Sequence, residues 1–163
     1  MNGASMVATT STSKELCESL GATHVVNYRE AKVEEALQEH KFDLIFDTVG
    51  GYDHWVSAQK LMAPSGHYVT IAGDLVSLPR MIPRIIWRKL AAMVSSSPSY
   101  DIFLTNANSA DLDVLKGMVE EGKLKAVMDT AKPFKFNDTG ARALFAKIMT
   151  GRTKGKLVME VSV

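Results

Sequence analysis

The stretch Phe42-Asp-Leu-Ile-Phe-Asp-Thr-Val-Gly-Gly51 decides the fold that this sequence predicts. Its aromatic and branched residues suit a buried strand, and its two glycines permit the backbone angles that end one. A helix is expected to follow directly, from Tyr52 to Met62. A buried strand that leads through a tight turn into a helix is the repeating unit of a parallel α/β sheet.

The same alternation continues on both sides of this unit. Upstream, Thr12-Ser-Lys-Glu15 matches a capping box, which predicts the start of a helix that runs to about Leu20. Downstream, Pro64-Ser-Gly66 predicts a turn into the next strand. The expected strands are Met6–Thr10, His24–Tyr28 and His67–Ala72, with a further helix at Glu30–His40. Such alternation favours an α/β fold with a mainly parallel, doubly wound sheet.

A proline-rich region, residues 75–99, interrupts this rhythm. Pro83 is expected to begin a helix that extends through Met93. Strand and helix signals then return. The expected elements are a strand at Tyr100–Thr105, a helix at Ala110–Glu121, an extended segment at Leu124–Phe134, a helix at Asp138–Met149 and a strand at Leu157–Val161.

Composition excludes several classes of function. The 163 residues are 46% hydrophobic, and 19 Lys and Arg balance 18 Asp and Glu, so we expect no nucleic-acid partner. Cys17 is the single cysteine and the four histidines lack a metal-ligand spacing, so we expect no metal site. No apolar run reaches the ~18–20 residues of a membrane span.

The residues after each strand are the candidates for ligand binding, because open parallel sheets bind ligands at the carboxyl ends of their strands. In Ala8-Thr-Thr-Ser-Thr-Ser-Lys14 no acidic residue stands where an NAD site usually places one. Hydroxyl groups and Lys14 beside a helix N-terminus would suit a phosphate. The alternative is that these residues only cap the helix.

Other candidates are weaker. Tyr28 is expected to stack on an adenine or to reach the same phosphate, and Arg152 and Lys156 are expected to reach a cofactor phosphate from the last turn. An ordinary strand-end tyrosine and solvated turn residues are the alternatives. Arg80, Arg84 and Arg88 share one helical face, for which we expect a solvated surface over a packed one.

Four segments resemble the cofactor domain of medium-chain, zinc-free quinone oxidoreductases: Val7–Lys14, Leu20–Tyr28, Phe42–Gly51 and Gly151–Val158. Within that family, Phe42–Trp55 and Gly117–Val127 are most similar to its reticulon-interacting mitochondrial branch. The resemblance implies a Rossmann-like fold, NADP(H) as cofactor, and hydride transfer to a quinone, activated alkene or enone as small-molecule substrate. We expect an intracellular location, mitochondrial or cytoplasmic, of which the mitochondrial one follows from the resemblance to that branch alone. The family resemblance also implies a homodimer through the strand around Phe103.

The resemblance also assigns site residues. Lys14 and Tyr28 match the positions that hold the adenosine 2′-phosphate. The remaining expected cofactor-binding residues are Ser11, Ser13, Thr48, Val49, Gly50, Ala72, Gly73, Phe103 and Leu104, with Arg152 and Lys156 from the last turn. No catalytic side chain is assigned.

The chain departs from that family at its N-terminal side. Residues 1–163 are expected to form a partial NADP(H)-binding Rossmann domain that lacks the first strand, the glycine-rich turn and the barrel-like catalytic domain. We therefore expect weak activity or none from this chain alone. The competing hypotheses are a non-catalytic interaction module with a degenerate nucleotide-binding fold, and an unrelated flavodoxin-like domain.

Overall fold

The computed structural model describes residues 3–73, 78–94 and 98–161. The chain forms two compact units, Ala4–Asn106 and Ala107–Val163, which we call the N-terminal and the C-terminal unit. Within the described ranges, no helix is both long enough and apolar enough to cross a bilayer.

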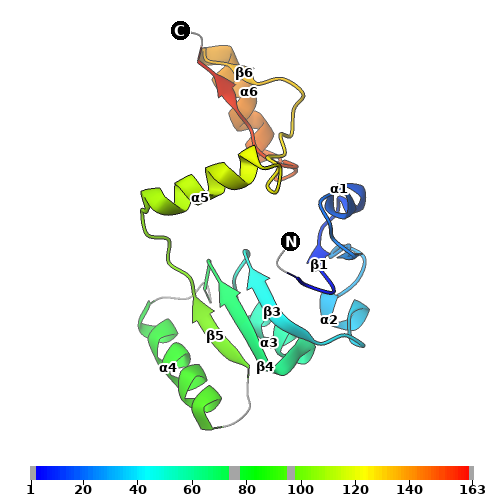
Figure 1. The fold of residues 1–163 in the computed structure, drawn as a ribbon, viewed down its shortest axis with the longest axis vertical. Coiled ribbons are helices and arrows are strands. Elements are labelled where there is room, and N and C mark those ends of the chain that lie inside the picture. Colours follow the sequence, from blue (N-terminus) through cyan, green and yellow to red (C-terminus); the bar gives the residue numbers. More distant parts are fainter. Residues whose placement is uncertain (1–2, 74–77, 95–97, 162–163) are drawn as a thin grey trace. The chain divides into compact units, whose positions relative to one another are not determined.

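Two parallel sheets build the N-terminal unit (Figure 1). β1 (Ala8–Thr10) pairs with β2 (His24–Val26), and β4 (Met62–Thr70) lies between β3 (Phe42–Asp47) and β5 (Ser99–Ile102). All pairings are parallel, as predicted. The chain adds strands outward in one direction from β1 and in the other direction from β3, which is the order of a doubly wound fold.

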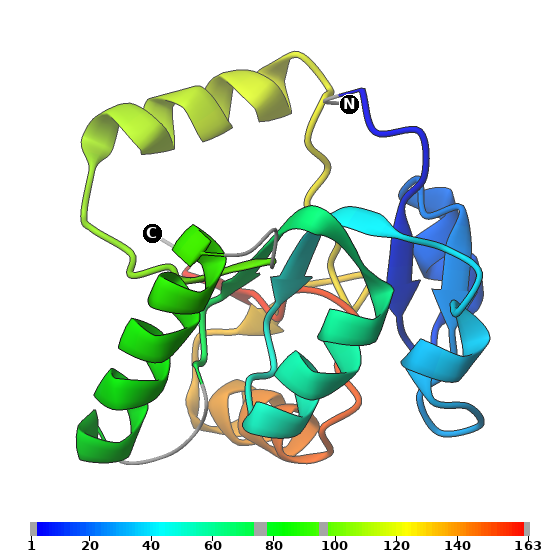
Figure 2. The same ribbon diagram turned by 90° about the horizontal axis from the view of Figure 1, so that it is seen from below.

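Aromatic side chains form the larger core of this unit. α3 (Tyr52–Leu61) buries Trp55 and Ala58 against Tyr68 and Tyr100 of the three-stranded sheet. The Trp55 ring lies 5.1 Å from each tyrosine ring, in the edge-to-face arrangement that aromatic pairs prefer. Figure 2 shows α3 and α4 (Leu78–Val94) along the sheet that they cover.

A second apolar cluster connects the two sheets. Val26, Leu37 and Leu61 are buried at its centre, with Ala8 of β1 and Ile45 of β3 packed against them. Strands that share no hydrogen bonds therefore share a hydrophobic core.

Two details of the helices predicted near the N-terminus were wrong, although both segments contain a helix. The helix expected at Glu30–His40 is limited to α2 (Val33–Ala36). Before it, Asn27 forms a turn in which its side chain accepts the Arg29 N–H and donates to Glu30. The capping box is also absent. α1 (Lys14–Ser19) starts after Ser13, which makes no side-chain cap, and Ser11 Oγ accepts the Ser13 N–H instead.

α4 differs from its prediction in two respects. It begins at Leu78, so Pro83 lies inside the helix. The expected solvated arginine face was also wrong: Arg88 is only 8% exposed, whereas Ile82 and Ile86 are 53% and 54% exposed. The side chain of Arg80 lies outside the described residues.

Aromatic rings explain why Arg84 and Arg88 of α4 turn inward. The Arg88 guanidinium carbon lies 4.1 Å from the centre of the Tyr100 ring and 5.2 Å from that of Trp55, and Arg84 lies 4.9 Å from Tyr52. Cation–π attraction offsets part of the cost of removing a guanidinium from water.

The C-terminal unit contains α5 (Ser109–Glu120), α6 (Asp138–Met149) and a parallel pair, β6 (Phe134–Lys135) and β7 (Met159–Glu160). Asn108 and Asn137 cap the helices by accepting the backbone N–H of Ala110 and Gly140. The helix predictions were confirmed to within a residue. The extended segment expected at Leu124–Phe134 was wrong, since only Phe134 enters a strand and Met128 forms a single bridge.

Candidate functional site

The carboxylate of Asp47 organises the end of β3. Its side chain accepts hydrogen bonds from the backbone N–H groups of Val49 at 2.9 Å and of Gly50 at 2.9 Å. It also accepts hydrogen bonds from the hydroxyl groups of two β4 residues, Tyr68 at 2.6 Å and Thr70 at 3.1 Å. One buried carboxylate thus fixes the loop that follows its own strand and ties it to the neighbouring strand.

The four donors keep Asp47 ionised. Burial alone raises the pKa of a carboxyl group. At Asp47 the hydrogen bonds outweigh burial, with that of the Gly50 N–H the strongest, so the pKa lies below its ordinary value of 3.8. The Asp47 carboxylate therefore stays negatively charged, and its oxygens already accept hydrogen bonds from groups of the protein.

The loops after β3 and β4 contact each other directly. The Gly51 N–H donates to the carbonyl oxygen of Gly73 at 2.8 Å, and Thr70 Oγ1 accepts the N–H groups of Ala72 and Gly73. Gly50 has φ +80°, and a Cβ there would lie 2.6 Å from the Ala72 Cβ. Only glycine fits this approach, so the structure brings the predicted residues Thr48–Gly50 and Ala72–Gly73 together.

The predicted phosphate-binding residues lie at the carboxyl end of the other sheet. The Ser11 N–H donates to the Val26 carbonyl at 3.0 Å, which joins the loop after β1 to the end of β2. Lys14 is 71% exposed, with its Nζ 3.8 Å from Glu18 Oε1, and Tyr28 is 58% exposed. Ser13, Lys14 and Tyr28 therefore share one edge of the β1–β2 sheet.

Phe103 and Leu104 follow β5 at the same end of the sheet as the loops of Asp47 and Thr70. The Phe103 N–H donates to the Thr70 carbonyl at 2.9 Å, and the two side chains are 56% and 77% exposed. Thr48 and Val49 are exposed as well. These side chains give the carboxyl edge of the three-stranded sheet an apolar rim.

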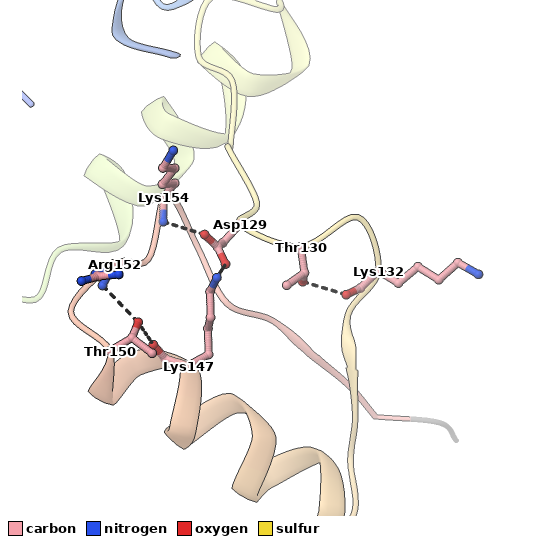
Figure 3. A network of polar contacts seen from close by, with 7 residues as sticks. All are labelled: Asp129, Thr130, Lys132, Lys147, Thr150, Arg152 and Lys154. Atoms are coloured by element: carbon pink, nitrogen blue, oxygen red, sulfur yellow. Dashed lines mark hydrogen bonds and ion pairs between the residues drawn. The ribbon is translucent and has the colours of Figure 1, made fainter. Parts of the chain in front are cut away.

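Arg152 and Lys156 belong to the C-terminal unit. Asp129 holds the turn that contains Arg152 and Lys154 (Figure 3), and Lys156 follows it in a bridge to Met128. Asp129 Oδ1 accepts the Lys154 N–H at 2.7 Å, and its Oδ2 lies 3.0 Å from Lys147 Nζ of α6. The Lys154 hydrogen bond and the Lys147 ammonium lower the pKa of Asp129 below 3.8. Thr150 Oγ1 accepts the Arg152 N–H at 3.1 Å, so both ends of the turn are fixed.

The sequence prediction missed Asp47, Thr70 and Asp129 as organising residues. Asp47 carried a recognisable signal, because an aspartate two residues before a glycine-containing turn commonly accepts its backbone N–H groups. Thr70 carried a weaker signal of the same kind, because its Oγ1 accepts the N–H groups of Ala72 and Gly73. The bonds of Thr70 to Asp47 and of Lys154 to Asp129 carried no local signal, since they join residues 23 and 25 positions apart.

The described residues offer no metal site. In residues 3–73, 78–94 and 98–161, no three His, Cys, Asp or Glu side chains come together in a way that could hold a metal ion. The strand ends instead present hydroxyl groups and one ammonium, which suit an anionic ligand such as a phosphate better than a metal ion.

Comparison with known proteins agrees with this architecture. The family described as "Zinc-binding dehydrogenase" matches residues 20–159. The trans-enoyl reductase pgmF of Aspergillus terreus is 29% identical over 90% of this chain and 42% of its own length. The 2-methylene-furan-3-one reductase of Solanum lycopersicum is 31% identical, with 96% of this chain and 34% of the relative covered.

Among solved structures, the quinone oxidoreductase from Coxiella burnetii superposes with a TM-score of 0.72 at 23% identity, over 96% of this chain and 45% of that one. This likeness concerns the fold. The chain spans less than half the length of these relatives. The fold and the extent of the family match agree: the chain belongs to the zinc-binding dehydrogenase family, within the medium-chain dehydrogenase/reductase superfamily.

Proposed function

We propose that this chain is the NADPH-binding portion of a zinc-independent oxidoreductase that reduces a quinone, an activated alkene or an enone. Relatives whose names include an enoyl reductase, a furanone reductase and an NADPH-dependent alkenal/one oxidoreductase from Arabidopsis thaliana support the reaction class. NADPH supplies the hydride when it is bound. The chain contributes the loops that hold the cofactor.

The observation that carries this proposal is the pair of loops fixed by Asp47 and Thr70. Their backbone conformation is set by hydrogen bonds within the protein, so nucleotide binding requires little further ordering. We assign the ribose to Thr48, Val49 and Gly50, and the nicotinamide to Ala72 and Gly73 with the rim residues Phe103 and Leu104.

The choice of NADPH over NADH rests on the edge of the β1–β2 sheet. Lys14 carries an exposed ammonium, and Ser11, Ser13 and Tyr28 add hydroxyl groups near the same strand ends. A 2′-phosphate gains a charge-assisted interaction with such a group, whereas a ribose hydroxyl does not. We assign Arg152 and Lys156 to phosphate binding as well, on their cationic character alone.

Calorimetric titration of the chain with NADPH, NADH and 2′-phospho-AMP tests the proposal. We expect the phosphorylated ligands to bind more tightly, and Lys14→Ala to weaken them by about 1.5–3 kcal/mol, roughly 10- to 150-fold, the range for a hydrogen bond to a charged group. Lys32→Ala is a matched control, because Lys32 is also 71% exposed and paired with a nearby glutamate. Equal affinity for NADH and NADPH, or no binding of either, would refute the proposal.

Finer assignments follow the resemblance of residues 42–55 and 117–127. We propose the reticulon-interacting, mitochondrial branch of the superfamily, and a homodimer that pairs the strand around Phe103 with its copy. Sedimentation velocity checks the dimer and fractionation checks the compartment. We also propose that turnover by these 163 residues alone is weak or absent, which a quinone-reductase assay decides.

A second function, a protein-interaction module, is favoured by one observation. α4 turns its arginines toward aromatic rings and leaves Ile82, Ile86, Trp87 and Leu90 at least half exposed. An exposed apolar helix face is a common feature of protein interfaces. Absence of nucleotide binding in the titration above would favour this function over the first.

A further inference from the structure

A cavity of about 450 Å³ lies between α3 and α4 in the N-terminal unit. This volume falls in the range of about 300–1,000 Å³ that is usual for small-molecule sites. Three aromatic side chains and two cations form most of its wall: Tyr52, Trp55, Trp87, Arg84 and Arg88. None of the residues assigned to the cofactor lines it, so the cavity is separate from the site loops.

The two guanidinium groups of the cavity are held close together. Arg84 and Arg88 are four residues apart on α4, so their side chains share one face of the helix. The guanidinium carbon of Arg84 lies 4.9 Å from the centre of the Tyr52 ring, and that of Arg88 lies 5.8 Å from the same centre. Arg88 is also only 8% exposed. The packing therefore positions both cations before any ligand arrives, which lowers the entropic cost of binding.

The cations give this cavity a preference for anions. A guanidinium binds a carboxylate most strongly, through two parallel N–H···O bonds, and an aromatic ring supplies no such oxygen acceptors. Among the described lining residues there is no acidic side chain, and Gln59 is the one further residue with an amide.

The rest of the wall suits a flat apolar group. The Tyr52 residue is 48% exposed and Trp87 is 71% exposed, so both rings have surface available for contact with a ligand. Aromatic rings pack against other rings in offset or edge-to-face arrangements. Two prolines and an alanine complete the lining beside Gln59. A small hydrophilic anion would leave these apolar surfaces in water.

From these observations we propose that the cavity between α3 and α4 binds a planar aromatic carboxylate. The carboxylate lies against Arg84 and Arg88, and the ring system packs on Tyr52 and Trp87. The proposal goes beyond cofactor binding and does not depend on it.

An aromatic carboxylate is favoured over a phosphate group. Phosphate sites commonly use free backbone N–H groups at the start of a helix. The arginines and Trp87 instead come from the interior of α4, where backbone N–H groups are already bonded within the helix. Side chains alone therefore form the anion-binding wall, and most of their remaining surface is apolar.

Nuclear magnetic resonance of the indole N–H groups tests this proposal. The chain has two tryptophans, Trp55 and Trp87, and both line the cavity. We expect 2-naphthoate to shift both indole resonances in a saturable manner, with Trp87→Phe identifying which resonance belongs to Trp87. Two control ligands are 2-naphthamide, which has the same shape without the charge, and acetate, which has the charge without the ring. Each should bind at least about tenfold more weakly than 2-naphthoate.

A pair of variants tests the role of the guanidinium. Arg84→Met removes the charge and keeps an unbranched side chain, and it should weaken 2-naphthoate binding by about tenfold or more. Lys89→Met is the matched control, because it removes a cation from the same helix at a position that does not line the cavity. It should leave the affinity unchanged. Far-UV circular dichroism verifies that both variants fold.

Several results would overturn the proposal. The absence of saturable shifts with 2-naphthoate would exclude the site, and equal binding of 2-naphthamide would exclude recognition of the carboxylate. Equal binding of acetate would show a general anion effect. Equal affinities of Arg84→Met and Lys89→Met would remove the arginine from the site. Loss of the 2-naphthoate shifts in saturating NADPH would assign the ligand to the cofactor loops instead.

Discussion

Substitution of Asp47 by asparagine tests whether this carboxylate holds the two site loops in place. The asparagine keeps one oxygen for the N–H groups of Val49 and Gly50. It places an NH₂ group where Oδ2 now accepts the Tyr68 hydroxyl at 2.6 Å and the Thr70 hydroxyl at 3.1 Å. Both hydroxyl bonds then lose their charged acceptor.

The expected cost follows from the strength of those bonds. Hydrogen bonds to a charged group contribute about 1.5–3 kcal/mol each, and the hydroxyls recover part of this by rotating to accept from the amide. We therefore expect Asp47→Asn to lower the free energy of unfolding by about 2–3 kcal/mol. In a chain of this length that corresponds to a fall in Tm of roughly 4–12 °C.

Thermal unfolding followed by circular dichroism measures this effect. Asp43→Asn is the matched control, because Asp43 is an exposed aspartate on the same strand, and we expect it to change stability by less than about 0.5 kcal/mol. Tyr68→Phe should remove part of the same stabilisation, because it removes one of the two hydroxyl donors. The double variant Asp47→Asn/Tyr68→Phe should lose less free energy of unfolding than the two single variants lose together. Equal Tm values for Asp47→Asn and Asp43→Asn would refute the role assigned to the carboxylate.

The pH dependence gives an independent check on the same residue. The pKa of Asp47 is lower in the folded chain than its ordinary value of 3.8, so the folded state binds this proton more weakly than the unfolded state. Its stabilising contribution is therefore fully present above the unfolded pKa and is lost as the pH falls through the folded pKa. Asp47→Asn should reduce the loss of stability below pH 3.8.

Two further substitutions test the loop contact and the buried arginine. Gly50→Ala should lower the free energy of unfolding by roughly 2–5 kcal/mol: about 1–2 for a positive φ and about 1–3 for the 2.6 Å overlap with Ala72. Gly117→Ala is the control, because open space surrounds that position, and it should leave the stability unchanged or raise it. A urea titration measures both variants. Arg88→Met should lower the free energy of unfolding by about 1–2 kcal/mol, because the cation–π contacts are lost. Lys89→Met is the control: it removes the ion pair between Lys89, which is 61% exposed, and Asp101, and should lower the free energy of unfolding by less than about 0.5 kcal/mol. Equal losses would contradict the assigned contacts.

The sequence predicted the strands and long helices because their signals are local. β3 and α3 follow from a run of branched and aromatic residues, two glycines and an amphipathic segment. α2 shows the limit of such signals, since a turn at Asn27 occupies the start of the segment for which apolar periodicity predicted a longer helix. Short helices depend on such competing side-chain bonds more than long ones do.

The positions of the site loops were predictable, but the bonds that fix them were not. Each loop follows a strand end, and strand ends can be located from periodicity. The bonds of Asp47 to Tyr68 and Thr70 depend on the register between β3 and β4, which pairs Asp47 with Thr70 after an irregularity between Phe42 and Leu44. The inward arginines of α4 depend on three rings from α3 and β5, and helical periodicity alone carries no information about those rings.

The two tryptophans give the protein two different fluorophores, one inside the aromatic core and one outside it. Trp55 is 6% exposed and 5.1 Å from the rings of Tyr68 and Tyr100, so light absorbed by either tyrosine is transferred to it. Trp87 is 71% exposed on α4 and emits as an indole in water. Iodide therefore quenches the red part of the emission and leaves the blue part, so that the packing of the N-terminal unit and the covering of α4 by a partner can be followed separately in one spectrum.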